Sequence, residues 1–346
     1  SVLDRGVYSS RKERVTAATP SFLPPMPEGE PHNRLGLAHW LLQADQPLLA
    51  RVTVNRMWQE LFGTGIVDTA DDFGIMGARP SHQELLDWLA VDFRESGWDM
   101  RRLYKLILTS ATYRQSQEVT PEKIAKDDKN RLLSRGPRFR MDAEILRDSA
   151  LQVSGLLVEK TGGPPVKPYQ PGGVWEAVSM PESNTKEYHA DKGESLYRRS
   201  MYSFWKRFAP PPSLETFDAQ AREVVCTKRA RTNTPLQALV TMNDPQFVEA
   251  ARKLAERAIK AAADDAGRIN FMAQTAISRS LDPNEAQAFG KSLGVFRNHF
   301  ASHEEDAAAL LTTGESPADT GIPATETATW TMVANQFLNL DEYVTK

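Results

Sequence analysis

Residues 231–247 read RTNTPLQALVTMNDPQF and contain two signals that begin a helix. Thr234 precedes Pro235, and Gln237 follows the threonine by three residues, which predicts an N-cap, a proline in the first turn and a capping-box partner. Asp244, also followed by proline, repeats the device and predicts a second helix. Four polar residues of the stretch have no part in these starts: Arg231, Thr232, Asn233 and Asn243. The stretch therefore predicts two consecutive helices with polar side chains left over for other partners.

Helical patterns continue on both sides of this stretch. After Asp244, apolar residues recur at helical spacing as far as Ala258, which predicts a long helix with one buried stripe. Residues 47–62 begin with proline and end before Gly63, so they also predict one helix. Capping residues mark further helix starts: Asn33, Asp99, Asp282 with Glu285, and Ser81 with Glu84. These signals predict a mainly α fold with at most minor β structure.

The predicted organisation has four parts. Residues 1–32 are expected to form an extended N-terminal arm, because residues 21–32, SFLPPMPEGEPH, contain four prolines. Residues 33–158 and residues 214–346 are predicted to form two helical subdomains. An irregular segment rich in Pro, Gly and aromatic residues, residues 159–213, is expected to bridge them.

Composition excludes several classes of protein. The 346 residues carry a net charge of -3, whereas a nucleic-acid-binding surface needs clustered Lys and Arg, so no nucleic-acid partner is expected. No apolar run approaches the ~20 residues that span a bilayer, and no transmembrane segment is predicted. The sequence begins with Ser1, and we interpret it as part of a longer chain whose targeting segment lies upstream.

The strongest catalytic and cofactor motifs are absent from the sequence. There is no Walker loop, dinucleotide fingerprint, His-Glu-x-x-His or Gly-x-Ser-x-Gly. Cys226 is the single cysteine, so neither an internal disulfide, a multi-thiolate zinc site nor a c-type haem attachment site is expected. We predict no metal and no cofactor in this chain. Cys226 itself is either a small buried residue or a thiol activated by the neighbouring Lys228 and Arg229.

Three residues are candidates for acid or base catalysis: Asp72, His82 and Glu223. Asp72 and His82 flank a glycine-bearing loop before a helix N-terminus, a position that lowers the pKa of a histidine. The alternative is that His82 is an exposed first-turn residue and Asp72 only supports the loop. Any enzyme activity must rest on such scattered residues.

Arginine and aromatic side chains are the candidates for ligand binding. Arg222, Arg229 and Arg231 offer guanidinium groups that clamp sulfate, carboxylate or sugar. The alternative is that they form a buried ion-pair network that holds the two subdomains together. Tyr169, Trp175 and Trp205 have rings that stack on sugars, or that supply core in an irregular region. Residues 201–208, MYSFWKRF, alternate in polarity and predict a short strand. Its buried residues are expected to be Tyr202, Phe204 and Phe208.

Five separated motifs occur in order along the chain: a string that begins ARVTVNRMWQELFGTG, then LILTSATYRQS, GGPPVKPYQPGGVW, RRSMYSFWKRF and RARTNTPLQALVTMNDPQF. Together with the closing LNLDEY, this order resembles the planctomycete PSD-type domain of unknown function. The resemblance covers nearly the whole chain. It implies the C-terminal domain of a large exported protein, located in the periplasm, cell envelope or outside the cell, with a c-type haem domain upstream. Such proteins are associated with polysaccharide breakdown, and the resemblance carries no catalytic residues.

Two functional hypotheses follow. The first is a non-catalytic binding or assembly module of an exported, haem-c-linked protein, with polysaccharide and the upstream haem-bearing domain as partners. The second is a carbohydrate-active enzyme, a hydrolase or lyase, that uses Asp72, His82 or Glu223. For the second hypothesis these groups must converge within one cleft.

Overall fold

The computed structural model describes residues 1–346 and contains 14 α-helices and one two-stranded sheet, which confirms the mainly α prediction. Contacts divide the chain into two units, residues 1–137 and residues 138–346. Each unit has a hydrophobic core of its own. None of the helices is long and apolar enough to cross a membrane.

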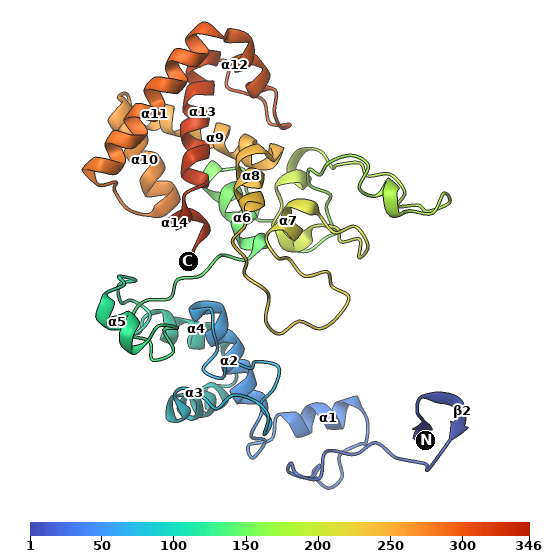
Figure 1. Cartoon of the computed structure of the whole chain (residues 1–346). Coiled ribbons are helices and arrows are strands. Elements are labelled where there is room, and N and C mark those ends of the chain that lie inside the picture. Colours follow the sequence, from blue (N-terminus) through green and yellow to red (C-terminus); the bar gives the residue numbers. More distant parts are fainter. The chain divides into compact units, whose positions relative to one another are not determined.

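Unit 1 packs its longer helices around an aromatic and aliphatic core. Val54 and Trp58 of one helix meet Leu86 and Phe93 of the next, and Leu103 closes the cluster. Its elements are β1 (Leu3–Asp4), β2 (Val7–Arg11), α1 (Arg34–Leu41), α2 (Leu49–Phe62), α3 (Gln83–Glu95), α4 (Met100–Leu108) and α5 (Pro121–Lys126). The two strands form an antiparallel pair within the segment predicted as an extended arm. Figure 1 shows this unit in blue and green.

Several predicted helix ends of unit 1 are confirmed. Asn33 accepts backbone N–H groups at the start of α1, Asp99 does so for α4, and Gly63 follows α2 with a φ of 78°. The capping box predicted for Ser81 and Glu84 is wrong. α3 begins one residue later, after His82, and its N-cap makes no side-chain bond. Ser81 donates its backbone N–H to Ile66 O at 2.9 Å, which joins the start of α3 to the segment that follows α2.

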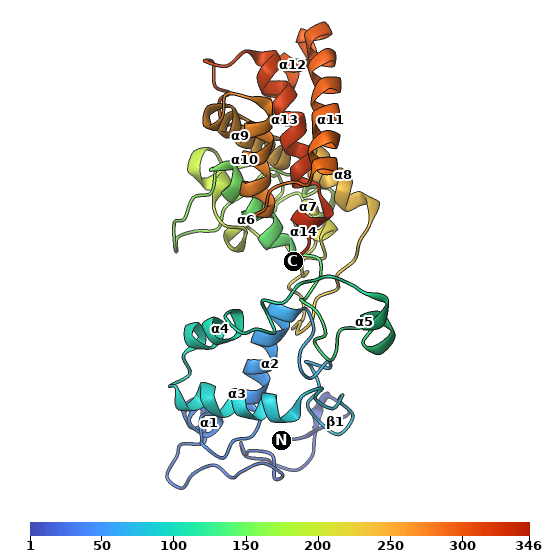
Figure 2. The same ribbon diagram turned by 90° about the vertical axis from the view of Figure 1, so that its left-hand side faces the viewer.

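Unit 2 is built around α9. Its elements are α6 (Ala143–Ser154), η1 (Glu176–Val178), η2 (Gly193–Tyr197), η3 (Ser200–Tyr202), α7 (Pro212–Thr216), α8 (Pro235–Asn243), α9 (Pro245–Ala261), α10 (Asp265–Ile277), α11 (Pro283–Ser302), α12 (Glu304–Leu311), α13 (Ala324–Leu338) and α14 (Asp341–Val344). Helices α6, α10 and α13 pack against α9, and α11 lies beside α13 (Figure 2). Fully buried alanines of α9, such as Ala250, Ala251 and Ala255, let these neighbours approach closely. The predicted apolar stripe after Asp244 is thus confirmed as core.

Residues 143–154 fall within the predicted 33–158 subdomain, whereas in the structure they form α6, which packs on α9 in unit 2. Leu146 and Ala150 of α6 belong to the same hydrophobic core as α9, which accounts for this placement. The buried Arg147 of α6 donates to Leu196 O at 2.6 Å and to Arg198 O at 2.8 Å in the irregular segment. Burial lowers the pKa of Arg147 to about 10, which still leaves the group charged at neutral pH. One arginine therefore ties α6 to the irregular segment.

The strand predicted at 201–208 is wrong. Residues 200–202 form the short helix η3, and only isolated bridges follow, such as the one between Val166 and Ser203. Phe208, expected inside, is 77% exposed. The backbone groups of this region pair with loops rather than with a neighbouring strand, so alternation of polarity did not correspond to a sheet.

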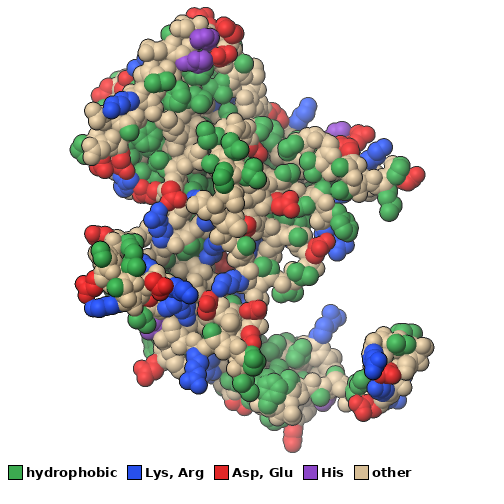
Figure 3. All heavy atoms as spheres, viewed as in Figure 1, with side chains coloured by type: hydrophobic (Ala, Val, Ile, Leu, Met, Phe, Trp, Pro, Cys, Tyr) green, Lys and Arg blue, Asp and Glu red, His purple; other side chains and the backbone are tan.

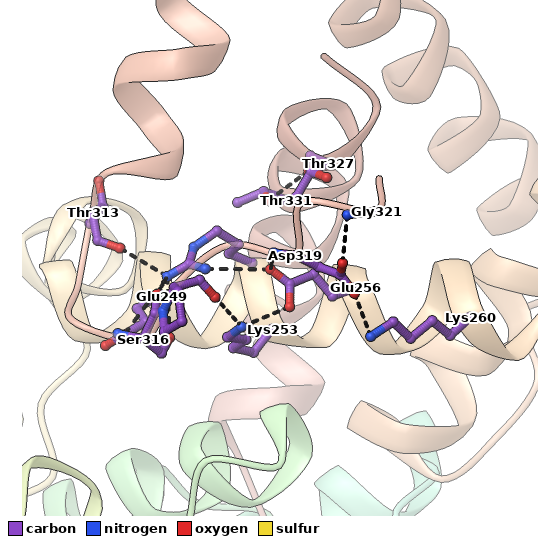
Figure 4. Close-up of polar contacts among 12 residues, drawn as sticks. Glu249, Lys253, Glu256, Lys260, Thr313, Ser316, Asp319, Gly321, Thr327 and Thr331 are labelled. Atoms are coloured by element: carbon purple, nitrogen blue, oxygen red, sulfur yellow. Dashed lines mark hydrogen bonds and ion pairs between the residues drawn. The ribbon is translucent and has the colours of Figure 1, made fainter. Parts of the chain in front are cut away.

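The loop between α12 and α13 is fastened to a charged face of α9. Arg252 donates to Ser316 O at 2.6 Å, and Glu249 Oε1 accepts from Ser316 N at 2.7 Å. Further along α9, Glu256 and Lys253 are paired at 2.8 Å, and Lys260 meets Asp319 at 2.6 Å (Figure 4). The loop thus supplies hydrogen-bond partners to Arg252 and Glu249, two charged residues buried on α9.

Surface charge is mixed rather than concentrated. On the face in Figure 3, Lys and Arg side chains are interspersed with Asp and Glu. This distribution agrees with the small net charge of -3.

Candidate functional site

The three predicted catalytic residues lie in two different units. Asp72 belongs to a loop of unit 1, where its Oδ1 accepts the backbone N–H of Gly74 at 2.7 Å. His82 is the N-cap residue of α3, and its Nδ1 lies 3.0 Å from Ser81 Oγ. Glu223 lies in unit 2 on an exposed loop. The cavities described below are not lined by any of the three.

The predicted arginine cluster is engaged mainly with carboxylates. Arg229 forms a forked pair with Glu144 at 2.5 and 3.2 Å. Arg231 lies 3.8 Å from an oxygen of Asp142 and covers the ring of Phe139. Both carboxylates stand at the N-terminus of α6, so these two arginines hold the 220–231 loop against that helix. This is the ion-pair alternative of the sequence analysis.

The remaining predicted arginine, Arg222, differs from the other two. It is exposed, has a φ of 60° and places its guanidinium over the ring of Trp205, 4.6 Å from the centroid. The indole N–H of Trp205 donates to Ala221 O at 3.0 Å. The pair stiffens the start of the 220–231 loop and does not form the wall of a cleft.

Trp175 is a core residue. It is 1% exposed and lies between Tyr188 and Phe204, with Lys206 above its ring at 4.8 Å. No face of the ring is open to a ligand. Tyr169, the third predicted aromatic, does line a cavity.

That cavity, which we call the apolar pocket, has a volume of about 530 Å³ and is bounded by α8 and by residues 169–171. Three successive positions of one face of α8 form its floor: Leu236, Leu239 and Val240. Both leucines are largely exposed, an unusual state for apolar side chains on a packed helix. A mainly apolar cavity of this size is typical of small-molecule sites.

Polar groups gather on the same pocket: Tyr169, Gln170, Asn243 and Asp244. Burial raises the pKa of Asp244, although its Oδ1 accepts the N–H of Gln246 at 3.0 Å and caps α9. Gln170 has a buried Nε2 that makes no hydrogen bond. Tyr169 accepts the backbone N–H of Glu315 at 2.7 Å, and burial raises the pKa of its hydroxyl. The pocket therefore combines an apolar floor with a donor, an acceptor and a single carboxyl group.

Sequence reasoning found Tyr169 but missed the rest of this pocket. Asn243 was recognised as left over, whereas Asp244 was assigned only to helix capping. The available signal was the spacing of Leu236, Leu239 and Val240, which places three apolar residues on one face of a short helix. Such a face is normally core, so the pattern alone does not reveal that it is open.

No group of three or more His, Cys, Asp or Glu side chains is arranged to hold a metal ion. Cys226 is half-buried and its sulfur lies 3.2 Å from Lys228 O.

Comparison with known proteins places the chain by family only. A model of the family described as PSD1, protein of unknown function (DUF1553), matches residues 33–293. Neither a curated protein nor a solved structure matches the chain.

Proposed function

The chain belongs to the PSD1 family of proteins of unknown function, and from the geometry of unit 2 we propose that it is a non-catalytic module that binds polysaccharide. The observation that carries this proposal is the apolar pocket beside α8, with its exposed leucine floor and its polar edge.

Sugar rings present an apolar face of C–H groups and an edge of hydroxyls. Leu236 and Leu239 suit the apolar face, while Gln170 Nε2 and Asn243 suit the hydroxyl edge. The unpaired amide of Gln170 is a strong element of this argument, because a buried donor without a partner costs about 1–3 kcal/mol. A ligand oxygen at that atom removes the cost.

Binding is favoured over hydrolysis by the count of carboxyl groups. Glycosidases generally use two carboxyl groups on either side of the scissile bond, about 5–10 Å apart. The apolar pocket is lined by one, Asp244, and part of its hydrogen-bonding capacity is used to cap α9. Asp72, His82 and Glu223 do not line the apolar pocket, so this pocket adds no support to the hydrolase or lyase alternative.

We propose further that the module works in an exported protein beside a c-type haem domain, where it holds polysaccharide near a redox centre. The support for this part is the resemblance of five ordered motifs, not a feature of the fold. Fractionation of the native organism, with immunoblotting and haem staining of the intact protein, tests it. A cytosolic protein without haem would remove this part of the proposal.

The binding proposal is tested by isothermal titration calorimetry of the chain against neutral and sulfated polysaccharides, with new reducing ends monitored in the same samples. We expect binding without release of ends. Leu239→Asp should weaken binding at least tenfold, because it places a charge on the apolar floor. Val295→Asp is the matched control, since Val295 is a 65% exposed residue of α11 outside this pocket.

Two results would overturn the proposal. One is the absence of binding to every polysaccharide of the panel. The other is release of new ends that disappears in Asp72→Asn, Glu223→Gln or Asp244→Asn, which would establish an enzyme.

A further inference from the structure

A second cavity lies on the opposite face of α8. It has a volume of about 180 Å³, and we call it the polar pocket. Gln237 and Thr241 face it from α8, about half a turn away from the leucines of the apolar pocket. The other polar side chains that line it are Arg140, Asn233, Thr234 and Asn339, together with Asp341. Helix α8 thus separates an apolar cavity from a polar one.

Gln237 is the central observation. It is 3% exposed, and its Nε2 donates to Thr216 O at 3.1 Å and to Thr232 Oγ1 at 3.2 Å. Its Oε1 is buried and has no hydrogen-bond partner. The amide cannot gain by flipping, because Oε1 would then face the carbonyl oxygen of Thr216. The side chain therefore holds an unmatched acceptor, at a cost of about 1–3 kcal/mol.

The charged groups of the polar pocket are already matched to one another. Arg140 Nη1 lies 3.4 Å from Asp341 Oδ1, and Arg140 also donates to Asn233 Oδ1. Arg138 pairs with the second oxygen of Asp341. A ligand with a net charge would disturb this balance, so a neutral ligand is favoured.

The groups that remain for a ligand are uncharged. Thr234 is the N-cap residue of α8, yet its hydroxyl makes no capping bond. Asn339 Oδ1 accepts from Thr241 Oγ1 at 2.8 Å, which leaves the Asn339 amide N–H groups free to donate. Together with Gln237 Oε1, the pocket offers a hydroxyl, an amide donor and a buried carbonyl acceptor.

Size separates a ligand site from a hydration site. One bound water needs ~10–15 Å³ of such volume, and the polar pocket has about 180 Å³. A single ordered water therefore leaves most of the pocket unfilled, whereas a molecule with several hydroxyls matches both its volume and its mixture of donors and acceptors.

We propose that the polar pocket binds one neutral sugar unit, with a sugar hydroxyl donating to Gln237 Oε1 and others bonding Thr234 and Asn339. The inference rests on the proposed function for the ligand class alone, since its residues and its cavity are separate from those of the apolar pocket. Under this proposal, α8 lies between two ligand sites, one on each face of the helix.

The test is a titration of the ¹⁵N-labelled chain with free glucose, galactose and N-acetylglucosamine, followed by NMR. At least one sugar should shift the side-chain amide signals of Gln237 and Asn339. Thr234→Val should weaken the apparent affinity roughly threefold to tenfold without changing the fold, because the hydroxyl has no structural bond to lose. Gln237→Glu keeps the acceptor oxygen but adds a charge. If this variant folds, it is a second test of the same site.

Val295→Asp, on the exposed surface of α11 and outside both pockets, is the control and should leave the sugar shifts unchanged. Absence of shifts at these amides with every sugar, or shifts that Thr234→Val leaves unaffected, would overturn the inference. If polysaccharide still binds in calorimetry under either of these outcomes, only the inference about the polar pocket fails and the proposed function stands. If sugar shifts persist while polysaccharide does not bind, the proposed function fails and this site stands.

Discussion

The side-chain amide of Asn55 pairs with both backbone groups of Val67, accepting its N–H at 2.8 Å and donating to its carbonyl at 3.0 Å. Asn55 is fully buried on α2, between large apolar residues. The amide thereby holds the chain that leaves α2 against the helix. Gly65 lies so close that a Cβ there would meet Asn55 Nδ2 at 2.5 Å.

Asn55→Ala should lower the free energy of unfolding by about 2–4 kcal/mol, because it strands two buried backbone groups and leaves a small cavity. Guanidinium unfolding followed by circular dichroism measures the change. Arg56→Ala, at the next and exposed position of α2, is the control and should change stability by less than about 0.5 kcal/mol. Equal losses in both variants would contradict this account.

Two glycine-to-alanine changes should have opposite effects. Gly314 has a φ of 85°, and a Cβ there would lie 2.3 Å from Cδ of Glu249, so Gly314→Ala should destabilise by at least about 1–2 kcal/mol. Gly290 lies within α11 with open space around the same atom, so Gly290→Ala should stabilise by about 0.5–1 kcal/mol. Thermal unfolding of the two variants side by side tests this contrast. A change of the same sign in both would contradict it.

Tyr197 donates its hydroxyl to Glu249 Oε1 at 2.9 Å within the buried network of α9. Burial, with the nearby Glu249 carboxylate, raises the pKa of Tyr197 to about 12. Tyr197→Phe should cost about 1–3 kcal/mol, since it removes a donor from a buried carboxylate. Tyr202→Phe, which loses only an exposed bond to Gly162 N, should cost less. Chemical denaturation of both variants measures the difference, and a larger loss in Tyr202→Phe would refute the role given to Tyr197.

Arg279 joins Glu285 at the start of α11 to Glu342 of α14. Hydrogen bonds from Arg279 and from Asp282 N lower the pKa of Glu285 from 4.5 to about 2. A lowered acid pKa means that the folded state binds fewer protons than the unfolded state in this window. The contribution is therefore complete above pH 4.5 and is lost as the pH falls toward 2.

Carbon-detected NMR titration of the Glu285 carboxyl group should give a midpoint near pH 2. Glu285→Gln should flatten the dependence of stability on pH in the same window, by a modest amount because the group is largely solvated. A midpoint at the ordinary glutamate value would rule out the Arg279 pair as a strong one.

The apolar pocket can be tested for openness without any ligand. Because Leu239 is 53% exposed, Leu239→Asp should change the free energy of unfolding by less than about 1 kcal/mol. A loss of 2 kcal/mol or more would show that the leucine is core and that the pocket is closed in solution. Differential scanning fluorimetry against wild type is sufficient for this comparison.

Local signals in the sequence determined the helices. The caps at Asn33, Asp99, Asp244 and Asp282 were predictable, because each carboxylate or amide reaches backbone N–H groups within three residues. The same holds for the glycine that ends α2. The mainly α class and the long helix after Asp244 follow from such signals and from apolar spacing.

The capping box expected between Thr234 and Gln237 shows what neighbours along the chain do not determine. Helix α8 begins where the sequence predicts, but no side-chain cap forms. Gln237 is buried and pairs with Thr216 and Thr232 instead, since a buried amide without partners costs more than a cap contributes.

Tertiary structure alone decided the candidate sites. For Arg229 and Arg231 the sequence left both a ligand clamp and an ion-pair network open, and the carboxylates that they meet come from α6, more than eighty residues earlier in the chain. Trp175 became core for the same reason. Conversely, the leucines of α8 have the spacing of core residues. They are exposed because residues 169–171 border them without covering them. Helix starts depend on neighbours along the chain, whereas a pocket depends on which distant segments pack together, and the sequence of α8 alone does not specify those segments.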